Sequence, residues 1–302
     1  MRTTTWATNS FGTKAISNNY IDLLKAADLN YTAATAPIFA EYNGKKVEVL
    51  DKRAVIRKDT QELLGVVSSR YKVCQNVDAL SFVENINDIK LLKAGSVGQN
   101  NSTIYMIGQL PEVTVLGDTI TPHLIFQNSH DGLSGIKATI CMLRIVCQNQ
   151  FVSTFSASPA VISIRHQGDL EGNLIAASQT MNSMYEYITH YDEFAKEMVS
   201  QKVDRETFNK ILEGYFKIPE DATDRTKANI IDCRDYFTEC YNVDDNQNFK
   251  GTKYGLINAF SDYITHKEPM KKSSNWESSR FMNSINPYQM DQFRKVVDSI
   301  AA

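Results

Sequence analysis

The chain has 302 residues, of which 42% are hydrophobic, so it can bury a core and is not expected to be disordered. No apolar run approaches the ~20 residues of a membrane helix, and no secretory signal follows Met1. The five cysteines lack framework spacing, so we expect a reducing, cytoplasmic location and no membrane partner. The net charge of −3 hides two unequal halves: +3 in residues 1–167 and −6 in residues 168–302. The basic half is far less charged than a dedicated DNA-binding domain.

Strand patterns dominate the first half. Residues 17–28 predict a short helix that starts with capping residues, and residues 76–89 predict another with Asn76 as its candidate cap. The Asn43-Gly44 pair is a strong hairpin-turn signal. Strands are predicted, in chain order, over residues 46–50, 54–57, 63–67, 94–110 with an internal turn, 112–116, 123–151 as a hairpin, and 161–165.

Helical spacing replaces the strand pattern after Gly168. Helices are predicted over residues 169–214, 223–242, 252–266 and 288–300, with a polar loop at 244–249. Strands followed by helices are typical of an α+β protein rather than an alternating α/β protein. We expect one unit in which an antiparallel, strand-rich region, residues 1–167, packs against a helical region, residues 168–302.

The hairpin over residues 123–151 carries the most unusual side chains. Ser129, His130 and Asp131 cluster at its turn, and together with Cys147 they suggest nucleophilic catalysis. Adjacent His and Asp residues at a hairpin tip rarely align in the required way, and Asp131-Gly132 is also an ordinary turn pair. His130, Asp131 and Cys147 are therefore only weak catalytic candidates.

Motifs for cofactors and metals are absent from the sequence. There is no Walker loop, no Rossmann fingerprint, no His-Glu-x-x-His and no Cys-x-x-Cys. Cys141 and Cys147 are six residues apart in one predicted strand, about 20 Å, which is too far to share a metal. Cys233 and Cys240 share a predicted helix face with apolar residues and are interpreted as buried hydrophobic side chains. We predict neither a cofactor nor a metal.

Basic and aromatic residues on the strands suggest a second kind of site. Arg144 lies within an apolar strand, where it either forms a buried ion pair or binds phosphate. A nucleic-acid-binding face would take its phosphate contacts from Arg57, Arg70, Lys72, Arg144 and Arg165, its stacking rings from Tyr71 and Tyr105, and further contacts from Asn149 and His166. The alternative is an ordinary solvated sheet face that carries a few aromatic residues.

Several strings of residues occur together in this chain. They are residues 6–12 with Lys14, then 65–76, 127–132, 144–149, 164–166, 251–266, and Arg280 with Phe281. In these strings the chain resembles a bacterial family of phage- and plasmid-related proteins, domain-of-unknown-function family 932, over nearly its whole length. The resemblance implies a mobile genetic element in a bacterial host cytoplasm and implies no established activity. It also suggests that the separated strings converge on one face of the fold.

Three functions follow as hypotheses. The first is non-catalytic binding of single-stranded nucleic acid, with annealing in recombination or replication and assembly into a homo-oligomer. The second is an interaction protein that inhibits a host defence system through its acidic half. The third is a hydrolase that uses the Ser-His-Asp turn and Cys147.

Overall fold

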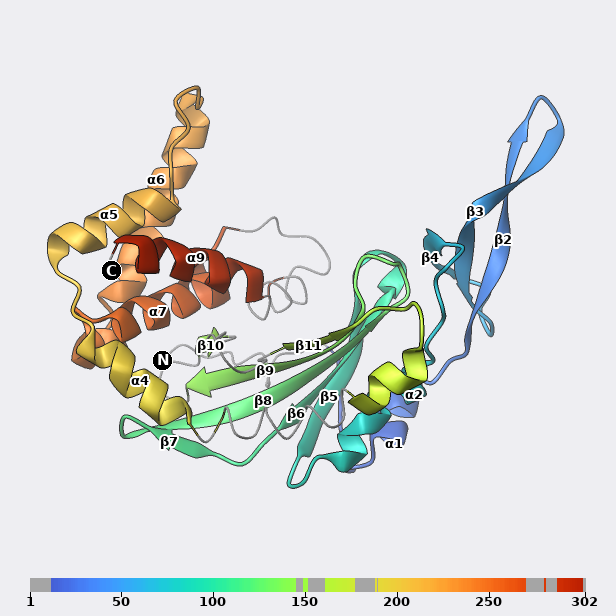
Figure 1. Ribbon diagram of the computed structural model, residues 1–302, viewed down its shortest axis with the longest axis horizontal. Helices are drawn as coiled ribbons and strands as arrows, with labels where there is room; N and C mark the ends of the chain where they lie inside the picture. Colours follow the sequence, from blue (N-terminus) through green and yellow to red (C-terminus); the bar gives the residue numbers. More distant parts are fainter. Residues whose placement is uncertain are drawn as a thin grey trace.

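The computed structural model describes residues 12–144, 149–151, 161–176, 188, 190–269, 280 and 287–300. A large curved sheet forms the base of the molecule, with a helical lobe at one end and a smaller sheet at the other (Figure 1). The strands are concentrated in the first half of the chain and the longer helices, from residue 191 onward, follow them, which confirms the predicted α+β class. The division into two regions at residue 167 stays a prediction.

The large sheet is antiparallel. Its strands run in the order β1-β5-β6-β8-β9-β10, while β7 pairs with β8 and β11 pairs with β9. The strands are β1 (Thr13–Lys14), β5 (Lys90–Val97), β6 (Thr103–Gln109), β7 (Val113–Val115), β8 (Asp118–Ser129), β9 (Ile136–Arg144), β10 (Asn149–Phe151) and β11 (Val161–Ile164). The predicted hairpin at residues 123–151 is present as the β8–β9 pair, but its second strand ends at Arg144. Residues 149–151 are not a continuation of that strand, because β10 pairs back antiparallel on β9 with Asn149 opposite Arg144.

The alternation of side chains along β6 shows how the sheet is covered. Ile104 and Met106 point to the face that packs against Leu24 of helix α1 (Tyr20–Ala26). Tyr105 points to the opposite face, where its ring passes close over Gly95 of β5 and is 1% exposed. Both faces of this strand are thus buried.

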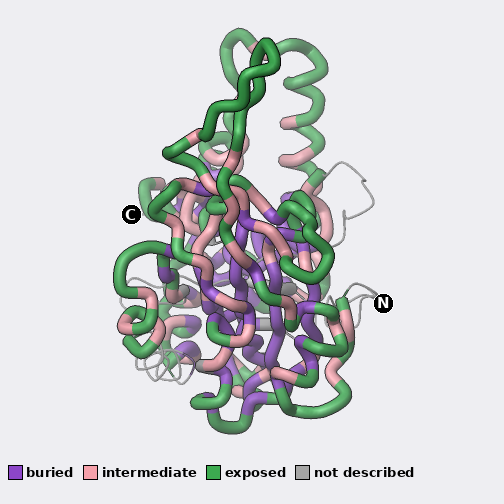
Figure 2. The backbone as a smooth tube through the Cα atoms, turned by 90° about the vertical axis from the view of Figure 1, so that its right-hand side faces the viewer, coloured by how far each residue is buried: buried purple, intermediate pink, exposed green. Residues whose placement is uncertain are grey.

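The smaller sheet has the order β2-β3-β4, with β2 at Ala33–Tyr42, β3 at Lys45–Arg57 and β4 at Leu63–Ser68. The predicted turn at Asn43-Gly44 joins β2 to β3, and both of its residues have positive φ. β4 pairs only with the second half of β3. Residues 38–51, here called the arm, therefore continue as a two-stranded ribbon that projects from the body and is mostly exposed (Figures 1 and 2).

The helical lobe is built around aromatic side chains. Phe260 of α7 stacks on Phe293 of α9 with 4.1 Å between ring centroids, and Phe237 of α6 packs beside them. The helices are α4 (Tyr191–Ser200), α5 (Arg205–Tyr215), α6 (Asp224–Tyr241), α7 (Lys253–Asp262) and α9 (Pro287–Ile300). One apolar cluster runs from these helices into the large sheet, so the lobe shares a core with the strands.

Local signals and tertiary structure disagree at several places. The helix predicted over residues 169–214 is broken at residues 201–204, which separate α4 from α5. The two strands predicted over residues 46–57 are one long strand, β3, which pairs with β2 on both sides of an irregularity between Glu48 and Arg53. Residues 244–249, predicted as a loop, form a 3-10 helix. Asn76 does not cap its helix α2 (Asn76–Leu80), which is followed by the 3-10 helix η1 (Ser81–Asn85), because its side chain bonds to another part of the chain.

Candidate functional site

Three of the unusual sequence strings meet where the small sheet packs on the large one. The Tyr71 hydroxyl donates to the backbone oxygen of Ser129 at 2.8 Å, and the Lys72 amide donates to the backbone oxygen of His166 at the same distance. Gly65 of β4 lies against the turn after β8, where a Cβ would come within 2.5 Å of the Asp131 Cα. These three strings converge, but they form a buried junction rather than an exposed face, and the string at residues 251–266 lies apart from them in the helical lobe.

Asn76 is the centre of the hydrogen bonds in this junction. Its Oδ1 accepts from Asn128 Nδ2 and from His130 Nε2, each at 2.9 Å, and its Nδ2 donates to the backbone oxygen of Leu29 at 2.8 Å. His130 must therefore carry its proton on Nε2, which leaves a lone pair on Nδ1. Burial lowers the pKa of His130 to about 4, so the ring is neutral at physiological pH.

The Asp131 carboxylate forms its hydrogen bonds with groups in and near the turn and not with His130. Its carboxylate accepts from the Ser102 hydroxyl at 2.9 Å and from the backbone amide of Leu133 at 2.8 Å, and it also accepts from the Ser129 hydroxyl. These bonds lower its pKa although burial opposes them. His130 and Asp131 thus form no base–carboxylate pair, and Cys147 lies outside the described residues. The geometry does not support the catalytic hypothesis.

Cys74 is the cysteine that the junction does contain. Its side chain is buried, and burial raises the pKa of its thiol to about 12. A thiol of this kind is protonated at neutral pH and is a poor nucleophile. Cys74 is therefore a packing residue.

A substitution at Gly65 tests how closely β4 packs against the turn after β8. Replacing Gly65 with Ala places a methyl group against the backbone of residues 130 and 131, which cannot yield as a flexible side chain would. We expect a loss of roughly 1–3 kcal/mol in the free energy of unfolding, measured in urea. Val66→Ala on the opposite face of β4, where the side chain is 51% exposed, is the control and should cost less. Equal losses would contradict the close approach.

The predicted nucleic-acid contacts fall into three groups. Arg70, Lys72 and Arg165 are exposed. Tyr71, Tyr105 and His166 are wholly or largely buried, and Tyr71 stacks on His166 with 4.7 Å between ring centroids. Because these rings are already covered, the structure does not support their use as stacking platforms for bases.

Arg144 and Asn149 form the third group. Their backbones face each other in the pairing of β9 with β10, but their side chains lie outside the described residues. The choice between an ion pair and a phosphate contact for Arg144 therefore stays open.

The arm contains exposed residues that the sequence analysis did not select. Tyr42 is 79% exposed, and it pairs directly with Lys45 across the ribbon. Lys46 lies over the ring of Phe39 at 4.8 Å. The turn signal marked this hairpin, but no local pattern shows that its outer half lacks a third strand.

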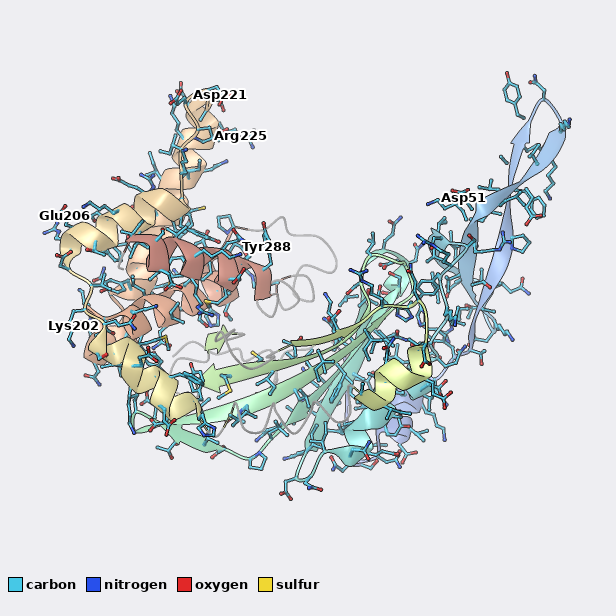
Figure 3. The ribbon with its side chains drawn as sticks, viewed as in Figure 1. Asp51, Lys202, Glu206, Asp221, Arg225 and Tyr288 are labelled. Carbon is cyan, nitrogen blue, oxygen red and sulfur yellow. The ribbon has the colours of Figure 1, made fainter. Side chains whose placement is uncertain are left out.

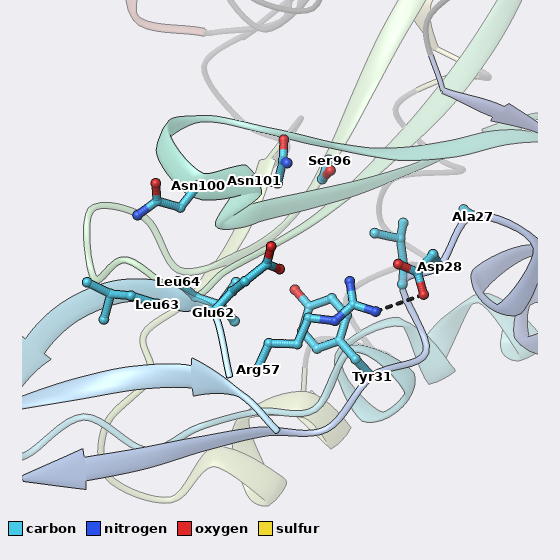
Figure 4. A pocket seen from close by; sticks show the side chains of 11 residues that line it. Ala27, Asp28, Tyr31, Arg57, Glu62, Leu63, Leu64, Ser96, Asn100 and Asn101 are labelled. Atoms are coloured by element: carbon cyan, nitrogen blue, oxygen red, sulfur yellow. Dashed lines mark hydrogen bonds and ion pairs between the residues drawn. The ribbon is translucent and has the colours of Figure 1, made fainter. Parts of the chain in front are cut away.

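Arg57 lies at the root of the arm in a pocket of about 380 Å³ (Figure 4). It donates to Asp28 at 2.7 Å and to both oxygens of Asp59 at 2.8 Å, and its guanidinium lies over the Tyr31 ring at 4.5 Å. Two carboxylates thus offset its charge, so the predicted phosphate contact is disfavoured at this residue. The pocket is lined by Ala27, Asp28, Leu29, Tyr31, Arg57, Glu62, Leu63, Leu64, Ser96, Asn100 and Asn101.

Residues 63–285 match a family described as Domain of unknown function (DUF932). The match covers well over half of the chain. The chain belongs to this family. The DUF932 match starts at β4 and includes the junction around Asn76 and His130. The arm precedes residue 63 and therefore lies outside the matched residues. Membership of family 932, expected from the sequence, is thereby confirmed, whereas the association with phages and plasmids stays a prediction.

No curated protein and no solved structure shows significant similarity to this DUF932 chain. Among the described residues, no helix has the length and apolar character needed to cross a membrane, and no group of three or more His, Cys, Asp or Glu side chains is placed to hold a metal.

Proposed function

We propose that this DUF932 protein binds single-stranded nucleic acid without catalysis, through the arm and its root. The observation that carries the proposal is a set of exposed cations with no ion-pair partner in the described part of the chain, one of which lies beside the exposed ring of Tyr42. These cations are Lys45, Lys52, Arg70 and Arg165.

The register of the strands links these cations from the tip of the arm to its root. Lys45 stands at the tip beside Tyr42, and Lys52 pairs with Ser68 near the end of β4. Arg70 follows two residues later, and the backbone bond from Lys72 to His166 brings Arg165 next to it. Figure 3 shows side chains extending outward along the arm near Asp51.

Cations and an exposed aromatic ring are the two elements that a sequence-tolerant single-strand site requires. Ammonium and guanidinium groups bind the phosphates, and the release of counterions makes the affinity depend on salt. A ring such as Tyr42 stacks on any base. Annealing by a homo-oligomer of a phage or plasmid protein in a bacterial cytoplasm extends the same proposal, and exposed Val47 and Leu50 offer apolar surface for assembly.

The experiment is a salt titration of binding to a labelled single strand of about 30 nucleotides, read by fluorescence polarisation. We expect the triple variant Lys45→Gln, Lys52→Gln and Arg70→Gln to weaken binding at every salt concentration. The slope of log affinity against log salt should fall by about 2, because each phosphate contact on a single strand contributes roughly 0.7.

The control removes three cations from the helices. Lys196, Lys210 and Lys295 are exposed and each forms an ion pair with a carboxylate four residues earlier. Changing all three to Gln alters the net charge equally but should leave the slope unchanged. Equal effects of the two triple variants, or no binding at low salt, would rule out the arm as the site.

The charge distribution in the acidic half, residues 168–302, gives little support to the alternative function, an inhibitor of a host defence system. On the exposed start of α6, Asp221 and Asp224 are interspersed with Arg225 and Lys227 (Figure 3). Carboxylates mixed with cations do not form the one-sided negative surface that mimicry of nucleic acid requires. The hypothesis of a host-defence inhibitor therefore rests on the net charge alone.

A further inference from the structure

We propose that the pocket at the root of the arm binds one nucleobase that carries an exocyclic amino group, cytosine or adenine, from the strand held by the arm. The assignment of the strand rests on the proposed function, whereas the pocket can also be tested with a free nucleoside. The pocket lies between the β5–β6 turn and the ends of β3 and β4 (Figure 4).

One wall of the pocket is flat and rigid. The Arg57 guanidinium is held by three hydrogen bonds to two carboxylates and lies over the Tyr31 ring, so its plane cannot turn freely. Tyr31 is fixed in turn by the His130 ring, with 6.0 Å between the ring centroids. A preorganised guanidinium plane favours a flat aromatic ligand, because stacking costs little further ordering.

The charge of the pocket argues against phosphate. Among the described residues that line it, Arg57 is the only cation, and Asp28 and Asp59 already offset that charge. Glu62 adds a carboxylate to the lining, and its Oε2 accepts only from the Thr60 hydroxyl, at 3.0 Å, among the described residues. Because carboxylates outnumber the single guanidinium at this pocket, a neutral ring that donates hydrogen bonds fits it better than an anion does.

The polar groups around the opening match the edge of a base. A carboxylate accepts from the amino group of cytosine, and an asparagine amide can pair with both the amino group and the ring nitrogen of adenine. Glu62 supplies the first group, and Asn100 and Asn101 supply the second from the opposite side (Figure 4). Both asparagines have positive φ, at 56° and 53°, so the tight β5–β6 turn presents them at the pocket.

Size and place agree with this assignment. A volume of about 380 Å³ lies within the range of pockets for small ligands. Arg57 ends β3 and Leu63 begins β4, so the pocket opens at the foot of the strands whose outer part forms the arm. A nucleic-acid strand that runs along β3 from Lys45 past Lys52 would reach Arg57 at the end of β3.

The test compares oligocytidylate with oligothymidylate of equal length, since both carry the same phosphates. We expect the protein to bind oligocytidylate about tenfold more tightly, as one hydrogen bond to a charged group is worth about that factor. Glu62→Ala should abolish the ratio and leave the affinity for oligothymidylate unchanged. Glu41→Ala, which removes an exposed carboxylate on the arm, should keep the ratio.

Free nucleosides separate the pocket from the arm. In NMR spectra, cytidine or adenosine should shift the side-chain amide signals of Asn100 and Asn101, and thymidine should not. Asn101→Gly, which preserves the positive φ, should weaken this binding without unfolding the turn. Nucleoside binding without oligonucleotide binding would reject the arm but support the pocket. Equal oligonucleotide affinities with no nucleoside shifts would overturn the pocket and leave the arm standing.

Discussion

Replacing Asn76 with Ala should lower the free energy of unfolding by roughly 3–5 kcal/mol. Asn76 is 1% exposed, and its side chain makes three hydrogen bonds, one to Leu29 and two to Asn128 and His130 at the end of β8. The substitution leaves His130 Nε2 and the backbone oxygen of Leu29 buried without this partner, and each such group costs about 1–3 kcal/mol. Urea unfolding followed by circular dichroism measures the loss.

The control for this prediction is Asn229→Ala on α6. Asn229 is exposed, so its removal should change stability by no more than about 0.5 kcal/mol. A loss below about 1 kcal/mol for Asn76→Ala would show that the junction does not depend on this residue. It would also remove the reason for the approach of the small sheet to the large one.

Acidification from pH 7 to pH 4.5 should destabilise the protein by roughly 5 kcal/mol. Burial lowers the pKa values of His123 and His130 to about 4, from an ordinary value of 6.5. Below pH 6.5 both histidines are protonated in the unfolded chain but stay neutral in the folded protein until the pH approaches 4. Each therefore removes up to about 1.4 kcal/mol of stability per pH unit, until the folded pKa is reached near pH 4.

Carboxylates affect this window little or in the opposite direction. The lowered pKa of Asp131 costs stability only as the pH falls below its ordinary value of 3.8. Burial raises the pKa of Glu268, so this residue stabilises the folded state as the pH falls and offsets part of the loss. The free energy of unfolding measured in urea at half-unit steps of pH gives the slope.

The variant His130→Asn isolates one of the two histidines. Between pH 6 and 5, the slope of the free energy of unfolding against pH should be smaller for the variant than for the unchanged protein. The difference should correspond to about one proton bound on unfolding, although the variant is less stable at every pH. A flat profile between pH 7 and 5 in the unchanged protein would show that His123 and His130 are protonated in the folded state. The conclusion that His123 and His130 are buried and neutral in the folded protein would then be wrong.

Local signals in the sequence were sufficient for much of the fold. The Asn43-Gly44 pair marked its turn because both residues accept positive φ, and the alternating residues of the β8–β9 hairpin marked its strands. Asp131-Gly132 was also interpreted correctly as a turn pair, since Asp131 accepts the amide of Leu133 and Gly132 has a φ of 77°. These features depend on interactions within a few residues.

Features that join distant segments were decided by the tertiary structure. Asn76 looked like a helix cap, but its partners are 47 and more residues away, so no local pattern reveals them. Arg57 looked like a phosphate contact until Asp28, 29 residues earlier, was found beside it. The buried side of Tyr105 depends likewise on Gly95 of the neighbouring strand.

By itself, the sequence determined the α+β class, most strands and helices, and membership of the DUF932 family. These follow from periodicity, turn residues and local strings, which act over short distances along the chain. Only the tertiary structure decided which polar residues are buried and which cations remain exposed. Burial and charge pairing depend on how β4 pairs with one half of β3 and leaves the arm free, and on how the small sheet packs against the turn at His130.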